Sequence, residues 1–333
     1  MSTCTVRTDQ RVFAVYAGLT AGGYDIAQID PGDEIATVVH AILEAPWPAH
    51  VIDYFRNARA TTCEANPYWP RAYMLVAAVM ELSSACSRGY PDPVRVRGII
   101  EAMPVDPAHR DPAAIEWLMG LPALIGQVAV ELWFDSLWTS YAEVVAPAIP
   151  LYQAAGEKAS ATLARIGIAG DRMPKLVIIP NLLQAWQIAD GVVAQDATYL
   201  ILARPDSGSI VHEALHSLFA QALECVRPAV DEANALYGPV HDSMIRMGYA
   251  WDDSPASWRR VWEESLVRAA SIWAECGDCP AEAARAAAGH ASLGFIYVPR
   301  LLQCFAGSSN GLNDVAGFVL ECLKACAGRA VHP

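Results

Sequence analysis

The chain has 333 residues, of which 54% are hydrophobic and 18% charged, so it can bury a large core and is not expected to be disordered. Its net charge of −13, from 36 acidic and 23 basic residues, argues against a nucleic-acid partner, because neutralising phosphates requires clustered Lys and Arg. The densest basic stretches, at Arg95 and Arg97 and at Arg259 and Arg260, are short and are expected on solvated faces.

The sequence also carries no mark of a membrane or exported protein. Residues 121–138 form the most apolar long window, but Gln127, Glu131 and Asp135 interrupt it, so it is interpreted as a buried helix. No basic region followed by an apolar run stands near Met1. Nine cysteines, an odd number, fit reduced thiols better than a disulfide framework. The expected location is the cytoplasm, without membrane contact.

The first part of the chain, residues 10–168, is predicted to be a run of helices. The apolar residues Ile35, Val38 and Ile42, for example, recur at helical spacing. A longer pattern over residues 131–166 predicts one or two helices with a break near residues 147–150, where Pro147 and Pro150 stand.

Two predicted strands and two predicted helices follow. Residues 175–180 and 197–203 are short, branched and apolar, which is typical of strands. A turn at residues 205–209 with several possible N-caps leads into a helix over residues 209–225. A second helix is predicted from Pro255 to Glu275, with Ser254 as its N-cap and Gly277 as its end.

The helix over residues 209–225 carries the motif HExxH, from His212 to His216. Histidines four residues apart lie above one another on a helix, so both can reach one cation. Glu213 is rotated by about 100° from His212, beside the metal, where it can act as general base on a metal-bound water. Apolar neighbours predict that this helix is mostly buried, which favours a metal over the alternative of two surface histidines.

An open coordination position for water requires a third protein ligand. The extended form HExxHxxGxxH is excluded by Phe219 and Ala222, which stand where Gly and His are needed. Carboxylates at Glu263 and Glu264 lie within the second predicted helix, and helical periodicity does not choose between them. The pair His241 and Asp242, in a predicted loop, is the less favoured alternative.

With this motif the chain resembles the gluzincins, zinc peptidases defined by HExxH and a Glu on a later helix. Residues 262–268, Trp-Glu-Glu-Ser-Leu-Val-Arg, look like their second motif, which implies Glu264 as ligand and Glu263 as its neighbour. The chain is similar, over most of its length, to an uncharacterised bacterial family of presumed metallopeptidases, through residues 9–13 and 176–183 as well. Members of such families are often exported, whereas no export signal is visible in this sequence.

The resemblance further implies a Tyr or His that stabilises the oxyanion, for which Tyr297 and His290 are the candidates. Tyr297 also fits an ordinary core tyrosine, and His290 also fits the cap of an Ala-rich helix. Arg268 fits either a partner that orients Glu264 or a solvated charge. The strand over residues 197–203 is a candidate for binding an extended peptide along its edge.

Four cysteines have suggestive spacing. Cys276 and Cys279 form a CxxC, and Cys322 and Cys326 lie one helical turn apart. Together they offer the donors of a four-thiolate zinc site; isolated thiols or one local disulfide are the alternative.

These observations predict an α+β protein, predominantly α-helical, with a helical N-terminal region (residues 1–145) and a zincin-like metallohydrolase domain (residues 146–333) in which a small sheet backs the HExxH helix. The expected function is zinc-dependent hydrolysis of a peptide or protein substrate, with Zn²⁺ on His212, His216 and Glu264, Glu213 as general base and Tyr297 as oxyanion donor. The alternatives are a zinc hydrolase of non-peptide amides or esters, and a non-catalytic binding or regulatory protein with a structural or relict metal site. The oligomeric state is left open.

Overall fold

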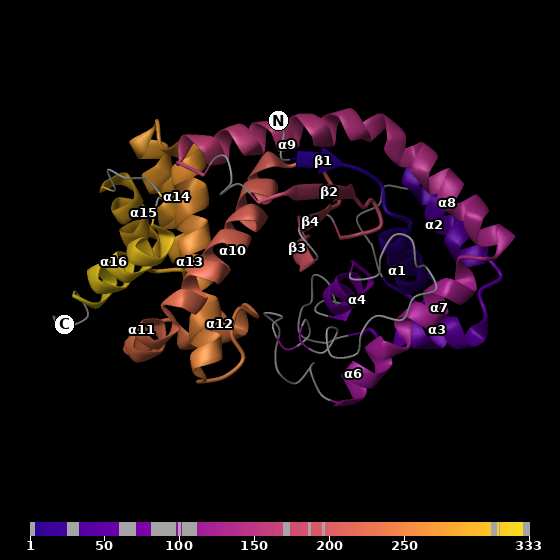
Figure 1. The fold of residues 1–333 in the computed structure, drawn as a ribbon, viewed down its shortest axis with the longest axis horizontal. Coiled ribbons are helices and arrows are strands. Elements are labelled where there is room, and N and C mark those ends of the chain that lie inside the picture. The colour runs from indigo at the N-terminus through magenta and orange to yellow at the C-terminus, as the bar shows by residue number, and fades with distance from the viewer. Residues whose placement is uncertain are drawn as a thin grey trace. The chain divides into compact units, whose positions relative to one another are not determined.

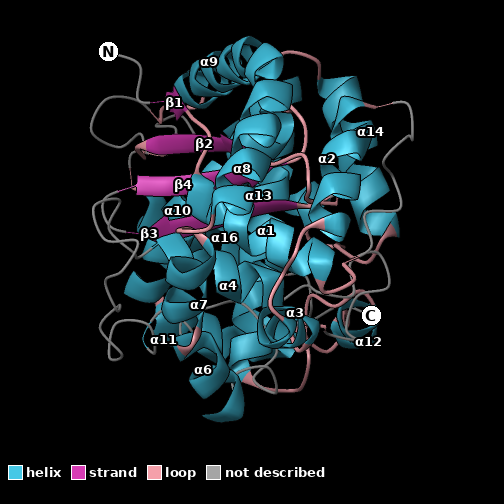
Figure 2. Cartoon of the chain, turned by 90° about the vertical axis from the view of Figure 1, so that its right-hand side faces the viewer, coloured by secondary structure: helices cyan, strands magenta, loops and turns pink. Residues whose placement is uncertain are grey.

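The computed structural model describes residues 4–24, 33–59, 71–80, 98, 101, 112–168, 174–185, 188–194, 197–307, 312 and 314–328. In these residues the protein is predominantly helical with one small mixed sheet, so the prediction of a mainly helical α+β fold is confirmed (Figures 1 and 2). Arg95 and Arg97 lie outside the described residues.

Two compact units make up the chain, and they are interleaved in sequence. Unit 1 contains Ala155–Lys175 and Ser207–Pro333, and unit 2 contains Cys4–Ala154 and Leu176–Asp206. Unit 2 therefore joins most of the expected N-terminal helical region to the strands that follow it, whereas the HExxH helix belongs to unit 1.

The N-terminal helices of unit 2 confirm the predicted helical run. They are α1 (Gln10–Ala21), α2 (Glu34–Glu44), α3 (Ala49–Arg56), α4 (Arg71–Met80), α6 (Pro112–Met119), α7 (Leu121–Val128) and α8 (Leu132–Val145), followed by the 3₁₀ helix η2 (Ala146–Ala148) and by α9 (Ile149–Arg165), which continues into unit 1. Asp9 caps α1, because its carboxylate accepts a hydrogen bond from the Arg11 backbone N–H.

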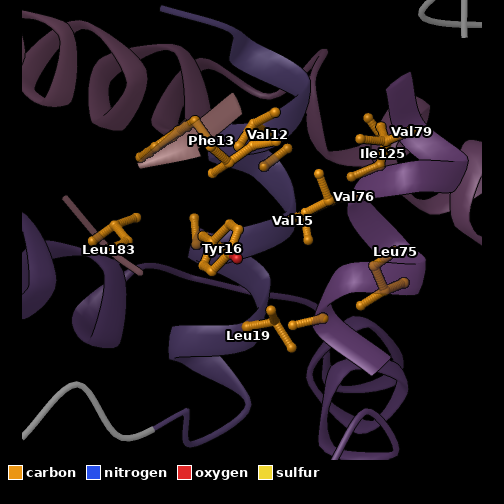
Figure 3. Close-up of a cluster of buried hydrophobic side chains, with 14 of the residues drawn as sticks. Val12, Phe13, Val15, Tyr16, Leu19, Leu75, Val76, Val79, Ile125 and Leu183 are labelled. Atoms are coloured by element: carbon orange, nitrogen blue, oxygen red, sulfur yellow. The ribbon is translucent and has the colours of Figure 1, made fainter. Parts of the chain in front are cut away.

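The core of unit 2 is built around α1, which is buried on nearly every side. In Figure 3 the labelled side chains of α1, such as Val15 and Leu19, lie toward Leu75 and Val76 of α4. Because α1 faces protein in most directions, its apolar residues surround the helix rather than forming one stripe.

The four strands of unit 2 form one sheet in the order β1-β2-β4-β3. They are β1 (Cys4–Val6), β2 (Leu176–Pro180), β3 (Ala189–Ala194) and β4 (Ala197–Leu202). β2 is parallel to β1 and β4, with Ile178 opposite Leu200, and β3 is antiparallel to β4. β2 and β4 are buried throughout, as expected for continuous apolar strands inside a sheet.

The central position of β4 corrects one prediction. Both edges of β4 are paired, with β2 on one side and β3 on the other, so an extended peptide cannot add along it. β3 was not predicted, because Asp190 and Gly191 interrupt its apolar pattern.

Unit 1 consists mainly of helices that surround one long helix, α13. They are α10 (Ser207–Cys225), α11 (Arg227–Glu232), the 3₁₀ helix η4 (Ala233–Leu236), α12 (His241–Arg246), α13 (Pro255–Cys276), α14 (Pro280–Ser292), α15 (Val298–Gly307) and α16 (Val315–Ala327). α13 packs against α10, α14 and α15, and its Trp258 and Trp262 are fully buried. The predicted start is confirmed, since the Ser254 side chain accepts from the Ser257 N–H.

The apolar window at residues 121–138 is two helices, α7 and α8, and not the single buried helix that was predicted. The chain bends by 93° at the break between them, where Val130 and Leu132 are exposed. In the part of the chain that the structure describes, no single helix is both long and apolar enough to cross a membrane; two sharply bent helix pairs meet those criteria only when each pair is taken together.

Candidate metal centre

Two helices of unit 1 bring three ligating side chains together. His212 and His216 lie one turn apart on α10, and Glu264 lies near the middle of α13, which packs against α10 (Figure 1). The Nε2 atoms of the two histidines are 3.2 Å apart. Oxygens of Glu264 lie 3.5 Å from His212 Nε2 and 3.3 Å from His216 Nε2. These three residues form a group that can hold a metal ion.

The spacing of these atoms fits a tetrahedral metal. A zinc ion with ligand distances of about 2.0–2.1 Å holds neighbouring ligand atoms about 3.3 Å apart. The two Nε2 atoms are 3.2 Å apart, Glu264 Oε1 lies 3.5 Å from His212 Nε2 and Glu264 Oε2 lies 3.3 Å from His216 Nε2, and one ligand atom from each residue lies within 4.8 Å of the other two. Two imidazole nitrogens this close cannot both direct an unshared lone pair at each other, so either a proton, as in an N–H···N hydrogen bond, or a metal ion lies between them. Glu264 is only 2% exposed, and a carboxylate buried this deeply needs positive partners, one of which is Arg268, whose Nη2 lies 2.6 Å from Glu264 Oε1.

Glu263 supports His216 from the other side of the ring. Its Oε1 lies 2.8 Å from His216 Nδ1, so Nδ1 donates to Glu263 and Nε2 is directed toward Glu264. The two neighbouring glutamates thus have different positions: oxygens of Glu264 face the Nε2 atoms of both rings, whereas Glu263 contacts His216 at Nδ1.

The charges in this group are strongly coupled. Burial opposes a charge on His216, but hydrogen bonds to Glu263 and Glu264 outweigh burial and raise the pKa of the imidazole to about 10. Burial would raise the pKa of Glu264, yet the contacts with His212 and His216 hold it well below its usual value. A proton and a metal cation therefore compete for the same position.

Glu213 lies beside the three ligating residues rather than among them. It is half-buried on α10, and within the described part of the chain its carboxylate makes no hydrogen bond or ion pair. Its charge, together with those of Glu264 and Glu263, raises the pKa of Arg260 against the effect of burial. A carboxylate next to a metal position and without a protein donor is available to accept a proton.

Arg268 holds Glu264 from one turn further along α13. Its Nη2 lies 2.6 Å from Glu264 Oε1 and 2.8 Å from the Tyr249 hydroxyl, and its Nη1 lies 3.2 Å from His290 Nδ1. The guanidinium also lies 4.1 Å from the centre of the Phe295 ring. Arg268 is thus a half-buried partner of Glu264 and not a solvated charge.

His290 and Tyr249 share the same arginine. Burial, followed by the charges of Arg268 and His212, lowers the pKa of His290, so the ring is neutral at pH 7 and Nδ1 accepts from Arg268. The Tyr249 oxygen accepts from Arg268 as well, and in the described residues its own hydrogen has no acceptor. Burial, with the charge of Glu264, raises the pKa of Tyr249, which keeps it a neutral donor.

Tyr297 lies in an aromatic cluster of unit 1. Its hydroxyl donates to the Leu236 carbonyl oxygen at 2.5 Å, and its ring contacts Trp258 and Trp262 edge-on. Burial raises the pKa of Tyr297 to about 12. The hydroxyl hydrogen of Tyr297 is therefore already donated to a backbone carbonyl oxygen.

The basic pair in α13 corrects another prediction. Arg259 Nη1 donates to Asp231 Oδ1 at 2.6 Å, and its side chain is 21% exposed. The Arg260 side chain is 17% exposed, with Nη1 3.9 Å from Glu263 Oε2 and Nη2 3.7 Å from Glu264 Oε2. The pair does not lie on a solvated face.

The remaining candidates do not join this group. His241 Nδ1 lies 2.8 Å from Asp242 Oδ1, so that pair interacts internally. All four cysteines considered for a thiolate site are free, with Cys279 exposed and Cys322 buried. Among the described residues, His212, His216 and Glu264 are the one group of three ligating side chains close enough to share an ion.

Sequence reasoning missed Tyr249 and the position of Arg260. Tyr249 stands in a loop after Gly248, whose φ of 78° marks a turn, and no motif surrounds it. Arg260 lies four residues before Glu264, a helical spacing that could have indicated its position near that carboxylate.

A comparison with protein-family models, with curated proteins and with solved structures found no match to this chain.

Proposed function

We propose that this protein is a zinc-dependent peptidase in which His212, His216 and Glu264 hold the metal and Glu213 is the general base. The observation that carries the proposal is that His212, His216 and Glu264 each offer a ligand atom within 4.8 Å of the other two, with the two Nε2 atoms 3.2 Å apart, close to one edge of a tetrahedral zinc site. Two imidazoles and one carboxylate leave one position of such a site for water, as in catalytic zinc sites.

When bound, zinc supplies Lewis-acid chemistry, because it lowers the pKa of a coordinated water and polarises a carbonyl. Glu213 would accept the proton of the attacking water and would return it to the leaving amine. The carboxylate of Glu213, one residue after His212, makes no hydrogen bond or ion pair with the described residues, which supports this role. Glu263 keeps His216 in the tautomer that directs Nε2 to the metal.

A donor is also needed where negative charge develops on the carbonyl oxygen. Tyr249 and His290 suit this role, since both are neutral and both are held by Arg268, which binds Glu264. Tyr297 stays a prediction, although its hydrogen bond to Leu236 favours the other two.

The test combines metal analysis with one substitution. The purified full-length protein is expected to hold one zinc ion, close to 1:1 by elemental analysis, and to cleave unstructured peptides as followed by mass spectrometry. Glu213→Gln is expected to keep the zinc and lose about 10²–10⁴-fold in kcat, because it removes only the base. Glu224→Gln, on the same helix but paired with Arg227 in solvent, is the matched control and is expected to remain active.

Each contrary result points to a different class of protein. Full activity of Glu213→Gln would refute the base assignment. A zinc-loaded protein that hydrolyses simple amides or esters but no peptide would be the non-peptide hydrolase. A protein that neither holds zinc nor cleaves any of these substrates would fit the binding or regulatory alternative.

A further inference from the structure

Two arginines of α13 flank Glu264, and they are used differently. Arg268 directs its two terminal nitrogens at groups inside the protein, namely Glu264, Tyr249 and His290. Arg260 makes two loose ion pairs at 3.7 and 3.9 Å, beyond hydrogen-bond range, and in the described residues its guanidinium donates no hydrogen bond. A guanidinium with free donors in a partly buried position is suited to an anionic group from outside the protein.

The position of Arg260 places these donors at the reacting site. Glu213, Glu263 and Glu264 are the acidic groups that act on its charge. Arg260 Nη2 lies 3.7 Å from Oε2 of Glu264, the proposed ligand, and Arg260 Nη1 lies 3.9 Å from Oε2 of Glu263. An anion held by Arg260 is held close to the bond that would be cleaved.

The charge of the site favours such an anion. With zinc bound and the histidines neutral, the carboxylates of Glu213, Glu263 and Glu264 face a divalent cation and the guanidiniums of Arg260 and Arg268, which leaves a surplus of one positive charge. One substrate carboxylate neutralises that surplus. In a partly buried site this favours an anionic substrate over a neutral or cationic one, because unpaired buried charge is unfavourable.

We infer that Arg260 binds a substrate carboxylate next to the scissile amide, so that the preferred substrates are peptides or N-acyl amino acids with a free C-terminus at the cleaved residue. The inference rests on the proposed function, since it names the substrate class of that site. A peptide carboxylate also occurs on an acidic side chain, and the test separates the two sources.

The first experiment measures binding, independently of catalysis. The probes are succinic acid monohydroxamate and its primary amide; both carry the same metal-binding hydroxamate, and only the first has a carboxylate. Calorimetry on the zinc-loaded full-length protein is expected to show about tenfold or tighter binding of the carboxylate form, the range of one charge-assisted contact. Arg260→Gln is expected to bring the ratio of dissociation constants to about one at unchanged zinc content.

The control is Arg259→Gln, because Arg259 is adjacent in sequence but is paired with Asp231. This variant should keep the full preference for the carboxylate form. Arg260→Lys keeps the positive charge but loses the planar guanidinium, which can donate two parallel hydrogen bonds to a carboxylate. This variant should retain only part of the preference for the carboxylate form. It also serves as the test variant if Arg260→Gln does not fold.

The second experiment assigns the source of the carboxylate. The zinc-loaded enzyme is offered three peptides: one with a free C-terminus, the same peptide amidated, and an amidated peptide that ends in Asp. The inference expects about tenfold higher kcat/KM for the free C-terminus than for either amide. Equal cleavage of the free peptide and the Asp-ending amide would instead assign the acidic side chain and overturn the C-terminal specificity.

The failures of the two proposals are distinguishable. Equal binding of the two hydroxamates by the wild type, or an undiminished preference in Arg260→Gln, overturns the role of Arg260 even in an active peptidase. A zinc-loaded protein could instead show the expected ratio of dissociation constants and yet cleave no peptide. That result would support the anion site at Arg260 and would overturn only the proposed peptidase function. If neither hydroxamate binds, both the proposed zinc site and the proposed role of Arg260 are overturned.

Discussion

At the scale of single residues, Glu263 and Glu264 are adjacent on α13 but contact different atoms of the histidines. Neighbours on a helix differ by about 100° in direction, so both cannot face the same ion. Glu264 reaches the Nε2 atoms of His212 and His216, and Glu263 reaches His216 at Nδ1. In the proposed site Glu264 would therefore be a ligand, and Glu263 would orient the ligand His216.

This difference predicts unequal effects on metal binding. Glu264→Gln removes a charged ligand and is expected to abolish zinc binding at micromolar metal, whereas Glu263→Gln is expected to weaken it by about 10–100-fold. Competition with a chromophoric chelator measures both affinities. Equal losses in the two variants would contradict the assignment of Glu264 as the ligand.

A pair of tyrosines allows a similarly sharp comparison. Tyr249 has a hydroxyl hydrogen without an acceptor in the described residues, whereas that of Tyr297 is bound to Leu236. If Tyr249 stabilises the developing oxyanion, Tyr249→Phe should lower kcat by about 10²–10³-fold with little change in KM. Tyr297→Phe should affect stability more than kcat. Steady-state kinetics of both variants on one peptide decides between them, and the reverse order would restore Tyr297 as the donor.

At the scale of elements, local sequence and tertiary packing contribute unequally. Ser254 and Gly277 mark the ends of α13 as predicted, because caps act on their own helix. Nothing comparable marks the break between α7 and α8, where no Gly or Pro stands. Ile125 and Val128 of α7 and Phe134 of α8 are buried in the same core, so packing accounts for the bend better than local propensity does.

The crossing of α1 and α3 gives a test of this packing. A Cβ atom added at Gly18 would overlap the ring of Phe55, so Gly18→Ala is expected to destabilise the protein by about 1–3 kcal/mol. Gly289 in α14 has open space at the same position, and Gly289→Ala is expected to stabilise by about 0.5–1 kcal/mol. Urea unfolding followed by circular dichroism measures both. Stabilisation by Gly18→Ala would mean that Phe55 moves freely and that this contact is not tight.

At the scale of the whole molecule, the two units have separate roles. All seven residues assigned to metal binding, proton transfer or carboxylate binding, or to supporting them, lie in unit 1, and the sheet lies in unit 2. They are His212, Glu213, His216, Arg260, Glu263, Glu264 and Arg268. Changes in metal occupancy are therefore expected to affect the stability of unit 1 first.

The pKa of His216 predicts how that stability depends on pH. It is raised from about 6.5 in an unfolded chain to about 10 in the folded protein. The protonated ring thus stabilises the chelator-treated protein fully below about pH 6.5, and this contribution is lost as the pH rises through about 10. Zinc replaces the proton, so the zinc-loaded protein should not lose stability over that interval.

Hydrogen exchange at pH 7 and pH 9.5, with and without chelator, measures this effect by segment. The chelator-treated protein is expected to lose protection in α10 and α13 at the higher pH, after correction for intrinsic exchange rates, while β2 and β4 change little. An equal loss in the zinc-loaded protein would show that His216 does not hold the proton that zinc displaces.

The sequence by itself determined what depends on local periodicity and chain spacing. HExxH places His212 and His216 on one face of a helix whatever surrounds it, and apolar runs predict β2 and β4. Only the tertiary structure decided what depends on contacts between distant segments. In the tertiary structure β4 pairs with a strand on each edge. Tyr249 and His290 both accept hydrogen bonds from Arg268, and Arg260 lies 3.7 Å from Glu264. The physical reason is that periodicity fixes the direction of a side chain relative to its own element, whereas its partner is set by the packing of elements far apart in the chain.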